Sequence, residues 1–139
     1  MNAVNVGTNL NDAYYQQGSE AERWDRAQLF FGAKEYDKAA RVLRGLVDGS
    51  PQLTAPRLLL ARSYYHSAQL AKAETELRTV LEGCPVEQYA QLMLGRTLER
   101  QGRHAEAAPY LRTASALSGD FASLEDPRDV QGPDQGVRG

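Results

Sequence analysis

This sequence of 139 residues lacks several features on which common classes of protein depend. It has one cysteine, Cys84, so no disulfide can form within the chain, and a reducing cytoplasm is the expected location. It has no run of about 18 uncharged apolar residues, which argues against a membrane-spanning helix. The first ten residues contain neither Lys nor Arg, and we expect no secretory signal.

The net charge is small, and reactive groups are few. The net charge is only −2, whereas phosphate binding needs a strongly basic face, so nucleic acid is not an expected partner. The two histidines, His66 and His104, have no third ligand at a matching spacing, which argues against a metal site. No catalytic triad order, glycine-rich phosphate loop or apolar carboxylate pair is found. We therefore predict a protein without cofactors and without enzymatic activity.

The last twenty residues are acidic. Residues 120–139 carry five acidic side chains and two basic ones, a net charge of −3 (two minus five). This segment has few apolar residues and is rich in Gly and Pro, so we expect disorder beyond about residue 125. Its acidic residues are Asp120, Glu125, Asp126, Asp129 and Asp134.

What the sequence does contain is a repeat. Pro51 and Pro85 are 34 residues apart (85 minus 51). A fixed period of roughly 20–50 residues is typical of stacked repeat units. Further sets recur at this spacing: Ala27, Ala61 and Gly95; Ala39, Ala73 and Ala107; and Leu43, Leu77 and Leu111.

Each period contains two helical patterns, so six helices and no strand are predicted. Ser19 and Glu22 have the spacing of a capping box, and Gly102 and Gly119 mark a turn and a helix end. Small residues on both helices of a pair allow the axes to approach to roughly 8–10 Å. The aromatic residues Phe30, Tyr36 and Tyr64 are expected in the core between repeats. The predicted helices cover about residues 20–33, 36–48, 55–67, 70–81, 86–101 and 104–117.

The pattern resembles the tetratricopeptide repeat (TPR) family, with three copies at about residues 20–53, 54–87 and 88–119. Leu94-Gly95 matches the Leu-Gly pair of the family's first helix, and residues 36–39 (Tyr-Asp-Lys-Ala) match the opening of its second helix. Repeat one departs from the pattern, because Arg26 occupies the usual Leu position and Trp24 lies one residue after the usual aromatic position.

The resemblance implies a fold and a function. The fold is a right-handed α-solenoid of three helix-turn-helix repeats, with a concave groove lined by the first helix of each repeat. The function is that of an adaptor, which binds a peptide segment of a partner protein in this groove. Carried over from the family, the groove positions are Trp24, Gln28, Phe31, Leu58, Arg62, Tyr65, Tyr89, Met93, Arg96 and Arg100, with His66 beside them.

The groove residues also indicate the ligand. A TPR subclass binds the terminal carboxylates of heat-shock chaperones through Lys and Asn, which are absent from these positions here, so that partner is not expected. An aromatic groove with arginines instead suits hydrophobic anchors and an acidic residue. The alternative for Arg62, Arg96 and Arg100 is a solvated helix face with local ion pairs. The positions of the missing clamp hold Trp24, Gln28, Leu59, Tyr89 and Met93.

Both ends of the repeat region leave alternatives open. Residues 1–18, the N-terminal arm, include Tyr14 and Tyr15 and either form a short helix over residues 11–17 that covers repeat one or reach into a groove. Phe121 and Leu124 either cover the last helix or leave it exposed. An exposed end would favour self-association, so a homo-oligomeric assembly element is the alternative function.

Overall fold

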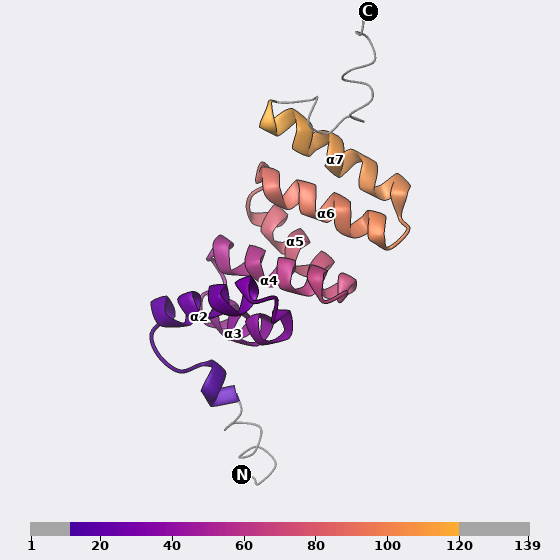
Figure 1. The fold of residues 1–139 in the computed structure, drawn as a ribbon. Coiled ribbons are helices and arrows are strands. Elements are labelled where there is room, and N and C mark those ends of the chain that lie inside the picture. The colour runs from indigo at the N-terminus through magenta and orange to yellow at the C-terminus, as the bar shows by residue number, and fades with distance from the viewer. Residues whose placement is uncertain (1–11, 120–139) are drawn as a thin grey trace, which may run out of the picture. The chain divides into compact units, whose positions relative to one another are not determined.

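The computed structural model describes residues 12–119, which form six α-helices and one helical turn at residues 12–15 (Figure 1). These described residues contain no strand, so the all-α fold class is confirmed. Each helix begins and ends within a few residues of its predicted range. The helices are α2 (Glu20–Gly32), α3 (Tyr36–Gly49), α4 (Thr54–His66), α5 (Leu70–Gly83), α6 (Gln88–Arg100) and α7 (His104–Ser118).

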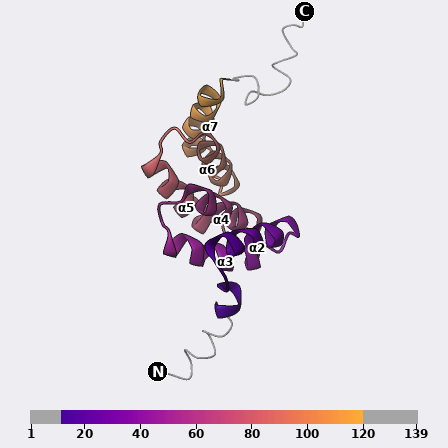
Figure 2. The same cartoon turned by 90° about the vertical axis from the view of Figure 1, so that its left-hand side faces the viewer.

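The chain divides into two compact units, Met1–Glu76 and Leu77–Gly139, and the boundary falls inside α5. In unit 1, α2 packs against α3, and α3 packs against α4 (Figures 1 and 2). In unit 2, α6 packs against α7. The predicted disorder beyond residue 125 and the predicted cover by Phe121 and Leu124 lie outside the described residues.

The turn between the two helices of each repeat has the same backbone geometry in all three repeats. Lys34, Ala68 and Gly102 adopt the left-handed conformation, with φ angles of 63°, 63° and 78°. Glycine takes this conformation without steric cost, so only the third repeat has the favoured residue. The next residue donates its N–H to a carbonyl five positions earlier, as in a Schellman motif. These bonds join Glu35 to Phe30, Gln69 to Tyr64 and Arg103 to Leu98, at 2.9, 2.8 and 2.9 Å.

Helix α2 begins with the predicted capping box. The Ser19 hydroxyl oxygen accepts a hydrogen bond from the Glu22 N–H at 3.1 Å, and the Glu22 carboxylate accepts one from the Ser19 N–H at 2.8 Å. Both bonds satisfy backbone donors that a helix start leaves without partners. The first helix of repeat one therefore begins as predicted, although Trp24 and Arg26 depart from the family pattern.

Small residues lie in the core of unit 1, as the repeat pattern predicts. Ala27, Ala39 and Ala73 are completely buried, together with Leu43 and Leu60. Complete burial of a leucine side chain stabilises a fold by about 1.5–3 kcal/mol relative to leaving it in water. The alanines allow the helices to approach closely, and the leucines supply the buried apolar surface.

In unit 2, α6 and α7 approach closely where Gly95 faces Leu111. A Cβ atom added at Gly95 would lie 2.6 Å from the Leu111 Cγ atom, which is too short for a non-bonded contact. Glycine at this position therefore permits the observed packing. Leu94, Leu98 and Ala107 are completely buried in this unit.

The N-terminal arm packs on repeat one through Arg26. The Arg26 Nη1 atom donates to the carbonyl oxygens of Tyr15 at 3.1 Å and Gln17 at 2.8 Å. At the equivalent positions of the later repeats, Leu60 and Leu94 are completely buried. Repeat one has arginine here because the position meets backbone carbonyls, which a guanidinium satisfies and a leucine does not.

Gln16 and Tyr15 complete this attachment of the arm. The Gln16 Nε2 atom donates to the Arg41 carbonyl at 2.7 Å, and the Gln16 amide occupies space that a side chain at Gly45 would fill. The Tyr15 side chain is buried against Phe30, with 6.1 Å between the ring centroids. The described part of the arm therefore packs against α2 and α3 of repeat one.

A buried carboxylate joins three helices of unit 1. Glu76 on α5 is only 6% exposed and accepts hydrogen bonds from Arg44 on α3 and Arg57 on α4, each at 2.7 Å. Burial alone would lower the pKa of Arg44, but the hydrogen bond and charge of Glu76 outweigh it and raise that pKa above its usual value. The Arg57 guanidinium also donates to the Pro51 carbonyl at 3.0 Å. This triad fixes α5 against both preceding helices.

Unit 2 uses the same positions, 34 residues later, without the carboxylate. The Gln91 Nε2 atom donates to the Pro85 carbonyl at 2.9 Å, just as Arg57 donates to Pro51. Arg78 replaces Arg44, and its Nη1 atom lies 3.0 Å from the hydroxyl of Tyr110, which stands where repeat two has Glu76. The buried ion triad is therefore a feature of unit 1 alone among the described residues.

Candidate functional site

Six of the predicted groove residues lie in unit 1, on the first helices of repeats one and two. On α2, Gln28 is exposed, whereas Trp24 and Phe31 are half-buried and pack against the hydrophobic core. On α4, the three residues are half-buried: Leu58, Arg62 and Tyr65. Half-buried side chains are held in place by the fold and still expose part of their surface to a ligand, as binding residues must.

Phe31 and Tyr65 belong to an aromatic cluster with Tyr36 and His66. The Tyr36 and His66 rings are stacked, with centroids 4.8 Å apart and an interplanar angle of 19°. Phe31 meets both rings edge to face, at 5.2 Å from Tyr36 and 5.7 Å from His66. Tyr65 meets His66 at 5.5 Å. Such pairs add about 0.5–1.5 kcal/mol each beyond the burial of area, so the cluster holds its rings in fixed positions.

Arg62 adds positive charge to this cluster. Its Cζ atom lies 4.6 Å from the centroid of the Phe31 ring. A guanidinium packed by its face on an aromatic ring keeps N–H donors at its edge, in the planar arrangement that fits a carboxylate. The site in unit 1 therefore combines apolar rings with a positioned hydrogen-bond donor.

The other four predicted residues lie on α6 in unit 2. Met93 is buried, so its main role is packing. Tyr89 is half-buried, and Arg96 and Arg100 are exposed. The Arg96 Nη1 atom pairs with the Glu99 carboxylate at 3.2 Å, which is the local ion pair that the sequence offered as the alternative for this residue.

The structure corrects the expectation for one aromatic residue, Tyr36. Tyr64 is buried, as predicted for a core residue, and Phe30 is half-buried but packs against the core of unit 1. Tyr36 is half-buried, and its ring stacks on that of His66 instead of lying in the core between repeats. The turn at Lys34 places Tyr36 beside Phe31. The short spacing of these two residues across the turn is the sequence signal that assigns Tyr36 to the aromatic cluster.

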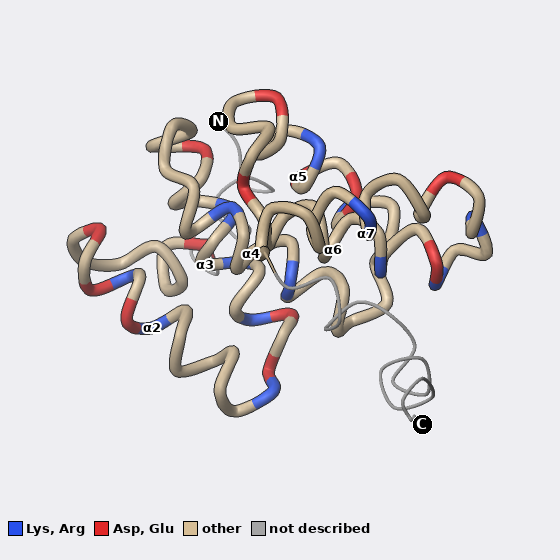
Figure 3. Tube along the Cα trace, turned by 90° about the horizontal axis from the view of Figure 1, so that it is seen from above, with Lys and Arg blue, Asp and Glu red and all other residues tan. Residues whose placement is uncertain are grey.

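The described residues offer no other obvious type of site. They contain no group of three His, Cys, Asp or Glu side chains arranged to hold a metal ion. None of the helices in residues 12–119 is both long enough and apolar enough to cross a bilayer. Acidic and basic residues are interspersed along the helices (Figure 3).

Solved structures of known proteins share this fold. A point mutant of MamA matches with a TM-score of 0.72 and 21% identity, over 83% of this chain and 85% of its own. MamA from Desulfovibrio magneticus matches with a TM-score of 0.65 and 23% identity, over 68% of this chain and 54% of its own. The CopN–Scc3 complex contains a chain that matches with a TM-score of 0.64 and 20% identity, over 68% of this chain and 55% of its own.

Sequence comparison identifies the repeat directly. No curated protein matches this sequence. Two family models, both described as tetratricopeptide repeat, match residues 30–94 and residues 89–115. Together they extend from the end of α2 to within α7, which is most of the described chain. These matches agree with the repeat period, the hairpin turns and the solved structures that share the fold: the chain belongs to the tetratricopeptide repeat family.

Proposed function

We propose that this protein is a non-enzymatic adaptor that binds a peptide segment of a partner protein on the first helices of its repeats. The observation that carries the proposal is the aromatic cluster in unit 1 with Arg62 packed on Phe31. Half-buried aromatic and arginine side chains are enriched among residues that dominate binding energy. The CopN–Scc3 structure, a complex by its name, further supports a protein as the ligand.

The chemistry of these residues defines the segment. Rings held in fixed positions contact aliphatic or aromatic anchors, and the Arg62 guanidinium donates hydrogen bonds to the carboxylate of an Asp or Glu of the ligand. In unit 2, Tyr89, Arg96 and Arg100 would supply the same combination. The ligand is therefore a segment with hydrophobic anchors and at least one acidic residue.

The test uses a partner isolated by affinity purification and then purified. Replacing both Arg62 and Arg96 with Glu should weaken binding at least about tenfold, which corresponds to about 1.4 kcal/mol. The matched control is Arg112→Glu, because Arg112 is exposed, as Arg96 is, but lies on α7, outside the first helices. Unchanged affinity in the double variant, with an unchanged melting temperature, would refute recognition by these arginines.

Self-assembly is a second candidate function, and one observation favours it. Leu29 on α2 is 75% exposed, although the equivalent residues of the later repeats, Ser63 and Thr97, are completely buried. Tyr14 of the arm is also exposed, at 56%. These apolar side chains would promote contact between copies. Light scattering of the full chain should then show oligomers, and Leu29→Ser with Tyr14→Ser should give monomers; a monomeric wild type would exclude this function.

We also infer a cytoplasmic location. The support is the single cysteine, Cys84, which is half-buried and carries no disulfide. Fractionation of cells expressing the tagged protein tests this inference, and recovery outside the cytoplasm would overturn it.

A further inference from the structure

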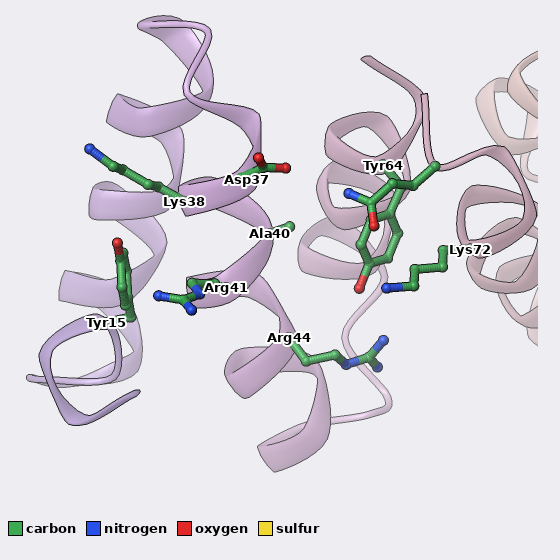
Figure 4. Close-up of a pocket in the computed structure, with 9 residues that line it drawn as sticks. Tyr15, Asp37, Lys38, Ala40, Arg41, Arg44, Tyr64 and Lys72 are labelled. Carbon is green, nitrogen blue, oxygen red and sulfur yellow. The ribbon is translucent and has the colours of Figure 1, made fainter. Parts of the chain in front are cut away.

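A second surface of unit 1 contains none of the groove residues. It is an open cleft of about 580 Å³ between the N-terminal arm and helices α3, α4 and α5. Figure 4 shows Arg41 beside Tyr15 on one side of it, Lys72 beside Tyr64 on the other, and Ala40 between them. We call this surface the basic cleft, because four of its lining residues are cationic: Lys38, Arg41, Arg44 and Lys72.

Two of these cations are held over buried tyrosine rings. The Arg41 Cζ atom lies 5.0 Å from the centroid of Tyr15, and the Lys72 Nζ atom lies 5.6 Å from that of Tyr64. The rings are anchored, since Tyr15 and Tyr64 are only 8% and 7% exposed. A cation–π contact fixes a cation without neutralising it. The basic cleft therefore presents two positioned positive charges.

The two other cations of the cleft are already paired with carboxylates. Arg44 is bound to Glu76, and Lys38 pairs with Glu35 at 2.8 Å, a contact that raises the pKa of Lys38. Within residues 12–119, by contrast, no carboxylate pairs with Arg41 or Lys72. One acidic residue, Asp37, lines the cleft, so its formal lining charge is +3 (four minus one).

We propose that the basic cleft binds the acidic segment at residues 120–139 of a second copy of this chain. The segment has a net charge of −3, opposite in sign to the two cations of the cleft that have no carboxylate partner among the described residues, Arg41 and Lys72. A cleft of several hundred Å³ accommodates a few side chains of an extended peptide. Carboxylates of the segment bind Arg41 and Lys72, which the two tyrosine rings hold in position. This inference concerns a different surface and a different ligand from the proposed adaptor function, so the two stand or fall separately.

The first experiment measures binding of a labelled synthetic peptide with the sequence of residues 120–139. The receptor is the full chain with its five acidic residues of that segment replaced by Asn or Gln, so that no other copy of the segment competes. Fluorescence anisotropy should show saturable binding that weakens with salt. Arg41→Gln with Lys72→Gln should weaken it about tenfold, whereas Arg112→Gln should leave it unchanged. Absence of binding, or equal binding to the cleft variant with an unchanged melting temperature, overturns the proposal.

The second experiment tests the source of the segment. The competitor is the full chain that carries Arg41→Gln and Lys72→Gln but keeps its native acidic segment, so it captures the labelled peptide only weakly itself. This chain should displace the labelled peptide from the receptor, because it presents residues 120–139 to another copy. The same competitor with the acidic residues neutralised should not displace it. Failure of the native segment to compete excludes a second copy as the source and overturns the proposal.

Discussion

Glu76 provides the sharpest test of the energetics of unit 1. Its carboxylate is 6% exposed and bridges Arg44 and Arg57, whose side chains are 40% and 12% exposed. The Glu76→Ala substitution would leave the Arg57 guanidinium nearly buried and without its counter-charge. Removal of one partner from a buried ion pair costs about 3–5 kcal/mol. We expect about 3 kcal/mol, the lower end, because Arg44 can regain water and keeps its contact with Asp48.

Urea denaturation followed by tryptophan fluorescence measures this loss. Trp24 is the only tryptophan in the sequence and lies in unit 1, so its signal reports the unit that contains the triad. The matched control is Asp48→Ala. Asp48 contacts the same arginine at 3.2 Å, but its side chain is 67% exposed, so its removal should cost at most about 0.5 kcal/mol.

The comparison separates a buried structural carboxylate from an ordinary surface ion pair. If Glu76→Ala lowers the free energy of unfolding by less than about 1 kcal/mol, no more than the Asp48→Ala control does, then Arg57 is readily solvated. The reasoning that the triad fixes α5 against α3 and α4 would then be refuted.

Three further substitutions test the fold. Ala73→Arg places a charge where the side chain is completely buried, so it should lower the free energy of unfolding by several kcal/mol, and an unchanged melting curve would contradict the close packing there. Ala68→Gly should stabilise the chain by up to about 1 kcal/mol in urea titrations, because glycine relieves the left-handed φ of 63°; a loss of stability would contradict the assigned strain. Arg26→Ala removes the hydrogen bonds to the carbonyls of Tyr15 and Gln17, so amide exchange in the described part of the arm should accelerate at least about tenfold. Unchanged exchange would show that the contacts of Tyr15 and Gln16 suffice to hold the arm.

Local signals explain how much of the fold could be predicted from the sequence. The capping box at Ser19 and Glu22 and the repeated turns locate helix ends through residues that are close in the chain. The repeat of small residues likewise identified Ala27, Ala39 and Ala73 as core positions, because packing at a repeat interface imposes the same size limit each time. These features follow from sequence because their physical causes are local or periodic.

The features that the sequence did not predict join residues far apart in the chain. Glu76 meets Arg44 and Arg57 across 32 and 19 residues, and no periodic signal marks them, since Tyr110 replaces the carboxylate in the next repeat. Arg26, a departure from the family pattern, bonds to carbonyls of the arm that lie 11 and 9 residues before it in the chain.

The candidate sites likewise combine residues that the repeat pattern assigns with contacts that only tertiary packing creates. The family pattern assigned the groove positions, but the stacking of Tyr36 on His66 depends on how α3 and α4 pack. The basic cleft is assembled from the arm, α3, α4 and α5, so its cations were visible in the sequence only as scattered surface charges. Pattern therefore assigns residues to helices, whereas tertiary packing decides which of them share a surface.

Hydrogen–deuterium exchange of the full chain, with and without its purified partner, tests the adaptor proposal most directly. The account predicts that the partner slows exchange in the first helix of each repeat: α2, α4 and α6, at residues 20–32, 54–66 and 88–100. Slower exchange confined to the second helices, α3, α5 and α7, would contradict it.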